Sequence, residues 1–334
     1  MKVLVVGCGS IGRRHLGNLR ALGIADIIAC DLDSDRASKV SEQYGIPVSL
    51  SLVEALQQGP DAALICTHPA NHLKAAQAAA EAGCHLFIEK PISHSLEGLH
   101  GFIREVEARS LVTCVGYNWR FHPSFQRLKQ LIDEGSIGTV LCARVNCGQY
   151  LPDWHPWEDY RQGYSAKRLL GGGVLLDSHE FDYVTWFLGE VERVSCIART
   201  ISRLEIDTED TADVVLEFQS GAQASLHLDY LQRPAQRSYE LFGTEGTIRW
   251  SLGESVTVLS PTAGKAQIFS DPPGFDLNTT YLDELRHFLC CVQNRSKAST
   301  DALRGKYILE LVMAAKESAQ TQKVVGIEAE VGTR

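Results

Sequence analysis

Residues 2–12 read KVLVVGCGSIG, an apolar run that passes directly into three spaced glycines. The run at residues 2–6 is short and rich in Val, which predicts a buried strand. Residues 11–22 then place apolar side chains at helical spacing. The stretch therefore predicts a strand, a tight glycine turn and a helix, which together form the first unit of a doubly wound sheet.

The same alternation continues outward from this stretch as far as residue 117. Further strand-like runs and helical patterns follow one another at 25–31, 33–45, 61–67, 72–83, 85–90, 95–110 and 111–117. Strands that alternate with helices form right-handed βαβ units, whose parallel sheet is covered on both faces. We expect an N-terminal α/β domain of the Rossmann type over residues 1–120.

The pattern changes after about residue 120. We expect helices at 125–138, 174–189, 280–294 and 301–320, and strands at 139–149 and through most of 193–260. Short glycine-containing turns join the later strands, which is typical of hairpins in an antiparallel sheet. We therefore predict a second domain over residues 121–334, of the α+β class, with a large, open and mostly antiparallel sheet.

Composition and charge exclude several classes of protein. The chain has 334 residues, of which 44% are hydrophobic, and a formal net charge of -9. An acidic balance argues against nucleic acid as a partner, and no apolar run is long enough to cross a bilayer. The ten cysteines form no CxxC pair, which favours reduced thiols in a cytoplasmic protein and gives no sign of a metal site.

The glycine loop carries the first functional prediction. Gly7 permits a tight turn, Gly9 lets the backbone approach a pyrophosphate, and Gly12 allows close packing of helix on strand. The start of the helix, with Ser10 and Ile11, offers N–H groups and a partial positive charge to phosphate oxygens. We expect a dinucleotide here; the alternative is a glycine-rich turn without a ligand.

An acidic residue at the end of the second strand bears on the type of dinucleotide. Asp31 lies nineteen positions after Gly12, where a carboxylate accepts hydrogen bonds from a ribose 2′-hydroxyl and repels a 2′-phosphate. This favours NAD over NADP. The alternative is that Asp31 caps the next helix, although Asp33 or Ser34 could do so instead, and Arg36 is close enough to weaken the preference.

A charged pair followed by proline, Glu89-Lys90-Pro91, ends the strand near residue 88. Ligands of doubly wound sheets bind outside the carboxyl ends of the strands, so this turn is expected to contact the cofactor. The charge of Lys90 could stabilise a developing alkoxide, and Pro91 could follow a cis bond. The alternative is a surface ion pair at the end of a strand.

The segment after the preceding strand is expected at the same sheet edge. Thr67, His68 and His72 follow that strand and are predicted to contact the cofactor or to shape the loop. A lone histidine in such a place is more often structural than catalytic, so we assign none of these three a chemical role.

Five stretches carry a resemblance to a known family: GCGSIGRRH at 7–15, THPANH at 67–72, EKP at 89–91, GYNWRFHP at 116–123 and GGGVLLDSHEFDYVTWFLG at 171–189. Over essentially its whole length the chain resembles the Gfo/Idh/MocA family, named for glucose–fructose oxidoreductase, inositol dehydrogenase and a rhizopine catabolism protein. The resemblance implies a nicotinamide-dependent oxidoreductase of sugars or cyclitols. It also implies a substrate pocket on one face of the second domain's sheet and an oligomer contact on the other.

The resemblance implies three catalytic residues, Lys90, Asp177 and His179. The family commonly spaces its Asp and His four apart, whereas here they are two apart. Positions i and i+2 of a helix do not face each other, so a direct Asp–His hydrogen bond would need a kink at Ser178 or a non-helical entry. We expect Asp182 to be a structural partner at a domain contact.

The residue chemistry supports His179 independently of the resemblance. An imidazole with an ordinary pKa of about 6.5 can take a proton from a secondary alcohol as hydride leaves the same carbon. Such a proton transfer typically contributes about 10²–10⁴-fold to the rate. The alternative is a histidine that caps or packs against the start of a helix.

The predicted substrate pocket draws on two segments. GYNWRFHP supplies Asn118 and Arg120, and the long aromatic-rich stretch at 150–168 supplies Arg161, Tyr164 and Lys167. Irregular stretches of that length are uncommon unless they are functional. The basic groups, with further support from Arg168, Arg233 and Arg237, would suit a carboxylate or phosphate; the alternative for each is an ordinary core or surface role.

These observations leave three functions open. The first is NAD(H)-dependent hydride transfer at a secondary alcohol or ketone of a sugar, a sugar acid or a nucleotide-sugar, for which the resemblance implies a connection with surface sugars such as sialic-acid-like ones. The second is hidden-redox cleavage of a glycosidic bond with tightly held NAD, and the third is a non-enzymatic regulator that senses dinucleotide. In each case we expect a homodimer or homotetramer built through the C-terminal sheet.

Overall fold

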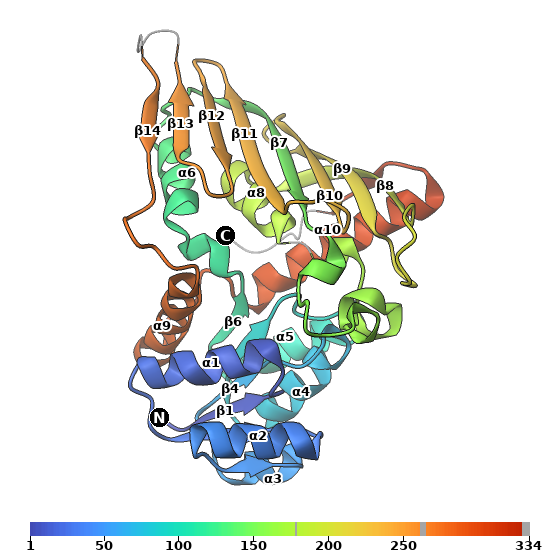
Figure 1. Cartoon of the computed structure of the whole chain (residues 1–334). Helices are drawn as coiled ribbons and strands as arrows, with labels where there is room; N and C mark the ends of the chain where they lie inside the picture. Colours follow the sequence, from blue (N-terminus) through green and yellow to red (C-terminus); the bar gives the residue numbers. More distant parts are fainter. Residues whose placement is uncertain (178, 261–264, 329–334) are drawn as a thin grey trace. The chain divides into compact units, whose positions relative to one another are not determined.

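The fold comes from a computed structural model, which describes residues 1–177, 179–260 and 265–328 (Figure 1). The described chain divides into two compact units. Unit 1 comprises residues 1–118 and 276–309, and unit 2 comprises residues 119–275 and 310–334. We describe each unit by itself.

Unit 1 is built on a six-stranded parallel sheet. Its strands are β1 (Val3–Val6), β2 (Ile27–Cys30), β3 (Val48–Ser49), β4 (Ala62–Ile65), β5 (His85–Glu89) and β6 (Thr113–Gly116). They lie in the order β3-β2-β1-β4-β5-β6. From β1, the strands β2 and β3 follow toward one edge of the sheet, and β4 to β6 follow toward the other. The strands β1 and β4 therefore flank the switch point at which ligands of doubly wound sheets bind. The predicted fold class is confirmed for this unit.

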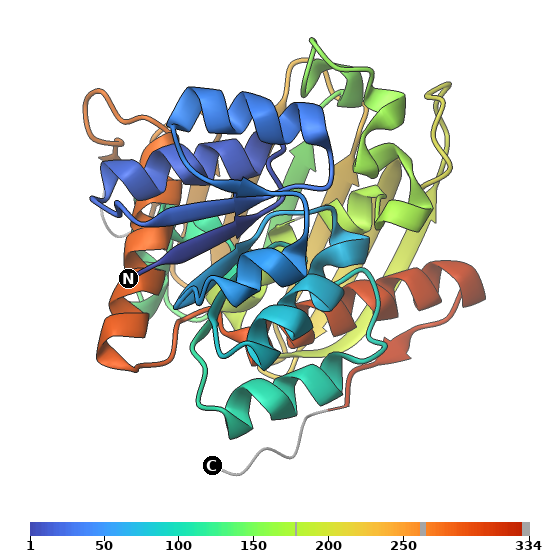
Figure 2. The ribbon, with the colours of Figure 1, turned by 90° about the horizontal axis from the view of Figure 1, so that it is seen from below.

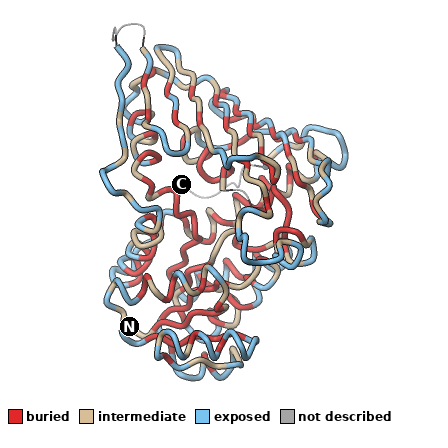
Figure 3. Tube along the Cα trace, viewed as in Figure 1, coloured by how far each residue is buried: buried red, intermediate tan, exposed pale blue. Residues whose placement is uncertain are grey.

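Helices cover both faces of this sheet (Figure 2). They are α1 (Ser10–Ala21), α2 (Ser34–Tyr44), α3 (Leu52–Gln57), α4 (Pro69–Glu81), α5 (Leu99–Ala108) and, from late in the chain, α9 (Asn278–Asn294). The buried strands appear as red segments in Figure 3. Phe288 of α9 lies edge-on to Phe87 of β5, with ring centroids 5.8 Å apart. Residues 276–309 thus pack with unit 1. The division into a dinucleotide-binding domain before residue 120 and a substrate-binding domain after it stays a prediction.

Unit 2 contains a nine-stranded sheet. Its strands are β7 (Val140–Gly148), β8 (Val191–Arg199), β9 (Thr211–Phe218), β10 (Gln223–Asp229), β11 (Gln236–Gly243), β12 (Thr247–Ser251), β13 (Val256–Leu259), β14 (Gln267–Phe269) and β15 (Val325–Gly326). The order is β14-β13-β12-β11-β7-β10-β9-β8-β15. Only the neighbours β7 and β10 run parallel among the described pairs, so the predicted open and mostly antiparallel sheet is confirmed.

Helices pack on one face of the nine-stranded sheet. They are α6 (Pro123–Asp133), α7 (Val174–Asp177), α8 (Glu180–Leu188) and the later part of α10 (Ala302–Thr321), which crosses the unit boundary after Leu309. The core between these layers is aromatic. The rings of Tyr183, Tyr239 and Trp250 each lie 5.1 Å from that of Phe125.

The segment around Asp177 and His179 differs from the single helix predicted at 174–189. Helix α7 ends at Asp177, and α8 begins at Glu180 with His179 at its N-cap position. The predicted kink at Ser178 lies outside the described residues. The long stretch before it, predicted to be irregular, contains four short 3-10 helices, at Leu151–Asp153, Tyr160–Gln162, Tyr164–Ala166 and Arg168–Leu170; a fifth spans Asn118–Phe121.

Candidate active site

The glycine loop joins β1 to α1 at the switch point of the parallel sheet. Gly7 has a φ of +95°, and a Cβ there would lie 2.7 Å from the carbonyl oxygen of Cys66. A Cβ at Gly12 would lie 1.9 Å from the carbonyl oxygen of Gly7, whereas one at Gly9 would meet nothing within 4 Å. Gly7 and Gly12 are therefore required by close packing of the backbone, and Gly9 leaves open space at the helix start where Ser10 and Ile11 follow.

Asp31 anchors this loop from the end of β2. Its carboxylate accepts a hydrogen bond from the backbone N–H of Cys8 at 2.7 Å and another from the N–H of Asp33 at 2.9 Å. Arg36 lies 3.8 Å from the same carboxylate and 3.0 Å from that of Asp33. Asp33, not Asp31, caps α2 by accepting the N–H of Arg36, so the alternative role for Asp31 as the helix cap is not what the structure shows.

The Glu89–Lys90–Pro91 turn lies at the end of β5, and its Lys90–Pro91 peptide bond is cis. The carboxylate of Glu89 lies 2.6 Å from Nε2 of His15, a fully buried residue of α1. Burial alone would raise the pKa of Glu89, but the hydrogen bond from His15 and the positive charge of Lys90 outweigh it and lower that pKa. The glutamate is thus held as a carboxylate beside the lysine.

His72 connects this turn to the loop after β4. The residue is buried in α4, with Nδ1 2.7 Å from the carbonyl oxygen of Pro91 and Nε2 2.9 Å from that of Thr67. Burial lowers the pKa of His72. His68 occupies the N-cap position of α4, where its Nε2 contacts Asn71 at 3.2 Å. His72 of α4 thus lies against both the turn at Pro91 and Thr67 of the loop after β4.

In unit 2, Asp177 is bound by two tyrosines. The hydroxyl of Tyr164 donates to Oδ1 at 2.5 Å and that of Tyr230 donates to Oδ2 at 2.6 Å. The aspartate side chain is buried, and burial, followed by the negative charge of Asp177, raises the pKa of Tyr230 well above its usual value. The phenol of Tyr230 therefore stays protonated and keeps donating to the carboxylate.

His179 has a different tyrosine partner. Its Nδ1 lies 3.0 Å from the hydroxyl of Tyr183, one turn further along α8, and the two rings are nearly parallel. The Tyr183 oxygen also accepts the backbone N–H of Trp119 at 3.2 Å. Because Tyr183 is fully buried against Phe125, it is a rigid partner that fixes the orientation of the imidazole.

Two protein-family models match this chain. The model of the "Oxidoreductase family, NAD-binding Rossmann fold" matches residues 1–117, and that of the "GFO/IDH/MocA C-terminal domain" matches residues 125–249. The myo-inositol 2-dehydrogenase of Thermotoga maritima is 30% identical over 99% of this chain and 100% of its own length. The chain belongs to the GFO/IDH/MocA family.

Two further relatives extend this result. The NAD⁺-dependent scyllo-inositol 2-dehydrogenase of Bacillus subtilis is 28% identical over 95% of this chain and 94% of its own length. A solved levoglucosan dehydrogenase, in complex with NADH and L-sorbose, superposes with a TM-score of 0.88 over 98% of this chain and 99% of its own, at 20% identity. That likeness shows the shared fold.

Membership in the GFO/IDH/MocA family makes this chain an NAD-dependent oxidoreductase, as predicted. The described residues of unit 1 fit that cofactor. The backbone at Gly9 is open to a ligand, while Gly7 and Gly12 are closed by packing, as the dinucleotide loop requires. Among the described residues, no helix is long and apolar enough to cross a membrane, and no group of metal-ligating side chains is assembled.

Two residues predicted to bind substrate are engaged within the protein. The side-chain amide of Asn118 donates to the hydroxyl of Thr280 at 2.8 Å. Arg120 binds both carboxylate oxygens of Asp182 at 2.7 Å, and its guanidinium lies 5.1 Å from the Trp186 ring centroid. Asp182 is therefore a structural partner of Arg120 inside unit 2, and a substrate role for Asn118 and Arg120 stays a prediction.

The basic groups expected to bind an anion also have partners. Arg161 lies 2.8 Å from Asp159 and 3.3 Å from Glu205, and Lys167 donates to the amide oxygen of Gln162 at 2.9 Å. Among the further basic residues, Arg168 donates to the Asp207 carbonyl, Arg233 lies over the Tyr150 ring, and Arg237 pairs with Glu180 at 2.8 Å. The contacts of these cations are therefore local ion pairs, hydrogen bonds and one cation–π contact.

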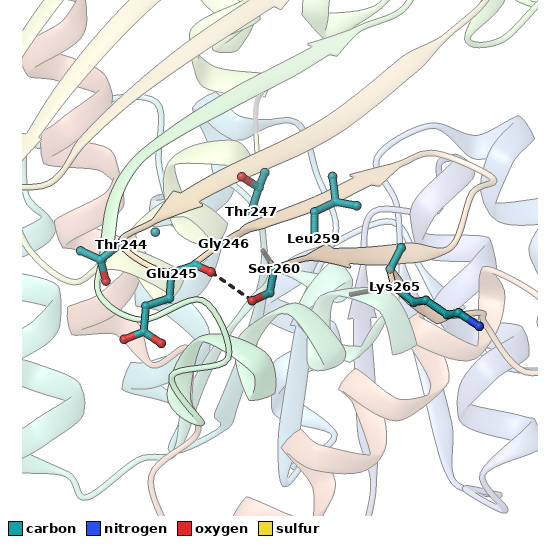
Figure 4. A pocket seen from close by; sticks show the side chains of 9 residues that line it. Thr244, Glu245, Gly246, Thr247, Leu259, Ser260 and Lys265 are labelled. Atoms are coloured by element: carbon teal, nitrogen blue, oxygen red, sulfur yellow. Dashed lines mark hydrogen bonds between the residues drawn. The ribbon is translucent and has the colours of Figure 1, made fainter. Parts of the chain in front are cut away.

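A hollow of about 650 Å³ lies in unit 2 near the ends of β11 to β14 (Figure 4). Its lining includes Thr244, Glu245, Ser260 and Lys265, and the Ser260 hydroxyl donates to the carbonyl oxygen of Glu245 at 3.2 Å. None of the predicted site residues lines it. It also borders the undescribed residues 261–264, so we assign it no role.

Three residues that support the predicted site were missed from the sequence: His15, Tyr183 and Tyr230. A signal existed for two of them. His15 ends the GCGSIGRRH stretch, and Tyr183 stands four residues after His179, the spacing of neighbours on one helical face. Tyr230 follows the end of β10, and nothing in its local sequence indicates a contact with Asp177.

Proposed function

We propose that this chain oxidises a secondary alcohol of a neutral sugar or cyclitol with NAD, and reduces the matching ketone with NADH. The observation that carries the proposal is the assembly at one edge of the parallel sheet. The glycine loop, Asp31 and the Glu89–Lys90–Pro91 turn all lie there, and His15 of the helix that follows the loop binds Glu89 of the turn. Bound NAD supplies the hydride acceptor in this reaction.

Lys90, His179 and Asp177 are the proposed catalytic residues. The positive charge of Lys90 stabilises the oxygen of the substrate as it loses its proton. His179 accepts that proton, with its ring orientation set by Tyr183 through Nδ1. Asp177 is a fixed carboxylate, since two tyrosine hydroxyls donate to it, and it orients substrate hydroxyls by accepting hydrogen bonds from them.

The proposed cofactor contacts are the residues predicted from the sequence. The loop residues Gly7, Gly9, Ser10, Ile11 and Gly12 bind the pyrophosphate, and Asp31 accepts from the ribose 2′-hydroxyl. The remaining proposed contacts are Thr67, His68, His72, Glu89, Lys90 and Pro91. For His72 and Glu89 the contribution is indirect, because their side chains bind within the protein.

A neutral substrate agrees better with unit 2 than an anionic one. Arg161 is paired with Asp159 and Glu205, and a substrate carboxylate would have to displace at least one of them. The relatives reported above that share 28–30% identity are named inositol dehydrogenases. The second substrate class comprises sugar acids and nucleotide-sugars. It would agree with the role in surface-sugar metabolism that the resemblance implies.

The test is a substrate panel read as NADH absorbance at 340 nm. Inositols, neutral monosaccharides and anhydrosugars are compared with sugar acids and nucleotide-sugars, each with NAD and with NADP. We expect turnover with free NAD on a neutral polyol. Turnover confined to anionic sugars would overturn the substrate class. Tightly held dinucleotide with no net redox on any sugar would instead support the hidden-redox enzyme or the regulator.

We further propose that the open face of the nine-stranded sheet binds a second copy of the chain. One row of cross-strand partners runs from Ile268 through Arg249 and Arg144 to Val215, so these side chains share a face. Exposed apolar side chains on that face are Ile197, Val215, Leu259 and Ile268. All ten cysteines are free thiols, which suits a reducing compartment and supports the predicted cytoplasmic location.

Light scattering on the purified protein tests the oligomer. We expect a homodimer or homotetramer, and a Val215→Glu variant that shifts toward monomer because a charge enters the apolar face. Glu97→Gln, an exposed change in unit 1, is the control and keeps the wild-type mass. A wild-type monomer at all concentrations would overturn the proposal.

A further inference from the structure

We propose that His15 and His72 are positioning residues for Lys90, which hold the Glu89–Lys90–Pro91 turn from its two sides. The inference rests on the proposed function, in which Lys90 acts on the substrate. Neither histidine has a place in that chemistry, and the contacts that connect them to the turn do not use the lysine side chain.

His15 holds the residue before the lysine. Its Nε2 lies 2.6 Å from Oε1 of Glu89, and the other carboxylate oxygen accepts the backbone N–H of Lys90 at 3.3 Å. The Glu89 side chain therefore connects α1 to the lysine's own backbone. Gly116 of β6 is the strand partner of Glu89, and a Cβ at Gly116 would lie 3.2 Å from the carboxylate, so a larger residue there would crowd it.

The surroundings of His15 show that its position is well defined. The ring is fully buried and lies edge-on to Phe87 and Tyr281, at 5.2 Å and 6.2 Å. Its Nδ1 is buried and has no hydrogen-bond partner among the described residues. A buried N–H without a partner costs more than a buried lone pair, so we assign the ring as neutral, with the proton on Nε2 donated to Glu89.

His72 holds the residue after the lysine. Its Nδ1 lies 2.7 Å from the carbonyl oxygen of Pro91, and its Nε2 lies 2.9 Å from that of Thr67. The ring is 1% exposed, so water does not compete for these contacts. Burial favours the neutral ring, which has one N–H to donate, and we assign that N–H to Nδ1, whose contact with Pro91 is the shorter. His72 of α4 thus holds the far side of the turn, while α1 holds the near side through Glu89.

The two histidines come from separate stretches of sequence. His15 ends GCGSIGRRH and lies in α1, whereas His72 ends THPANH and lies in α4. With the backbone held on both sides, the Cα of Lys90 has one position, which is the condition for a reacting group to be aimed correctly. A misplacement of about 1 Å can lower a rate roughly 10²-fold.

The test compares leucine and glutamine at each position. His15→Leu and His72→Leu remove the hydrogen bonds, and we expect kcat to fall at least about tenfold while the Kd for NADH changes by less than about threefold. His15→Gln and His72→Gln keep an N–H donor at similar reach and recover most of kcat. Phe288→Leu, which loosens the same core without touching the turn, lowers thermal stability and leaves kcat unchanged.

A double-mutant cycle separates positioning from a general structural role. If His15 acts through Lys90, then His15→Leu has little further effect on kcat in a Lys90→Ala background. An equal loss in both backgrounds, or full kcat in both leucine variants, would overturn the inference while leaving the proposed function intact. Full kcat in Lys90→Ala alone would overturn the proposed role of the lysine itself. Should His15→Leu fail to fold, Glu89→Ala removes the same connection between α1 and the backbone of Lys90 and takes its place in the cycle.

Discussion

The hydroxyl oxygen of Tyr183 lies 3.0 Å from Nδ1 of His179 and accepts the backbone N–H of Trp119 at 3.2 Å. Asp177, which the resemblance pairs with His179, accepts hydrogen bonds from Tyr164 and Tyr230. A tyrosine thus provides the described hydrogen bond to the ring of His179. Asp177 and His179 resemble the family's catalytic pair. Each of the two side chains lies within hydrogen-bond distance of a tyrosine hydroxyl.

Removing that hydroxyl tests its role. Tyr183→Phe should lower kcat about five- to tenfold, equivalent to the net contribution of about 1 kcal/mol for one hydrogen bond. The Kd for NADH should not change. Tyr239→Phe, which also removes one fully buried hydroxyl from unit 2, is the matched control. A kcat for Tyr183→Phe equal to that of the control would mean that Tyr183 serves packing alone.

Removing the imidazole itself should have a larger effect. His179→Ala should lower kcat near neutral pH by about 10²–10⁴-fold, because the proton acceptor is lost. The affinity for NAD, measured by titration of intrinsic fluorescence, should stay close to wild type. Equal losses of turnover and of cofactor affinity would indicate that His179 has a structural role at the start of α8.

Lys90→Ala should leave NAD bound but remove most turnover. The ammonium group stabilises negative charge on the substrate oxygen, and one such electrostatic contact is worth about 10²–10³ in kcat. Steady-state rates and NADH titration on the same preparation provide the measurement. The control is Lys74→Ala, an exposed position on α4. An unchanged kcat in Lys90→Ala would exclude the lysine from catalysis.

Asp31→Ser should narrow the preference for NAD over NADP, because the carboxylate that repels a 2′-phosphate is gone. The same change removes the acceptor for the N–H of Cys8, so we expect weaker binding of NAD as well as stronger binding of NADP. The ratio of kcat/KM for the two cofactors is the measurement. An unchanged ratio would mean that Arg36 or another group sets the preference.

Acid stability should depend on Glu89. Its pKa is lowered in the folded protein, so its contribution to stability is fully present above the ordinary glutamate pKa of about 4.3 and is lost as the pH falls through the lower folded value. Glu89→Gln should therefore have a lower Tm than the wild type at pH 7, and this difference in Tm should disappear near pH 3. Calorimetry across this range provides the measurement, with Glu97→Gln as the exposed control. A Tm difference that stays constant with pH would contradict the assigned charge of Glu89.

Much of the fold could be predicted because its signals are local. A strand of Val residues, a glycine turn, a helical pattern and a second strand lie within residues 2–31, and this order forms a right-handed βαβ unit. The mostly antiparallel sheet of unit 2 was predicted from successive strand-like runs joined by short turns. The break between α7 and α8 was not predicted as such, because hydrophobic periodicity continues across it and cannot show where helical hydrogen bonds stop.

The sequence by itself determined the dinucleotide loop, the acidic residue after the second strand and the family's lysine turn, since each depends on residues adjacent along the chain. Tertiary structure alone decided which groups hold them. His15 and Glu89 are 74 positions apart, Tyr230 and Asp177 are 53 apart, and α9 returns from late in the chain to the core of unit 1. These contacts form only when distant segments pack together, because a buried carboxylate must find its hydrogen-bond donors wherever the fold brings them.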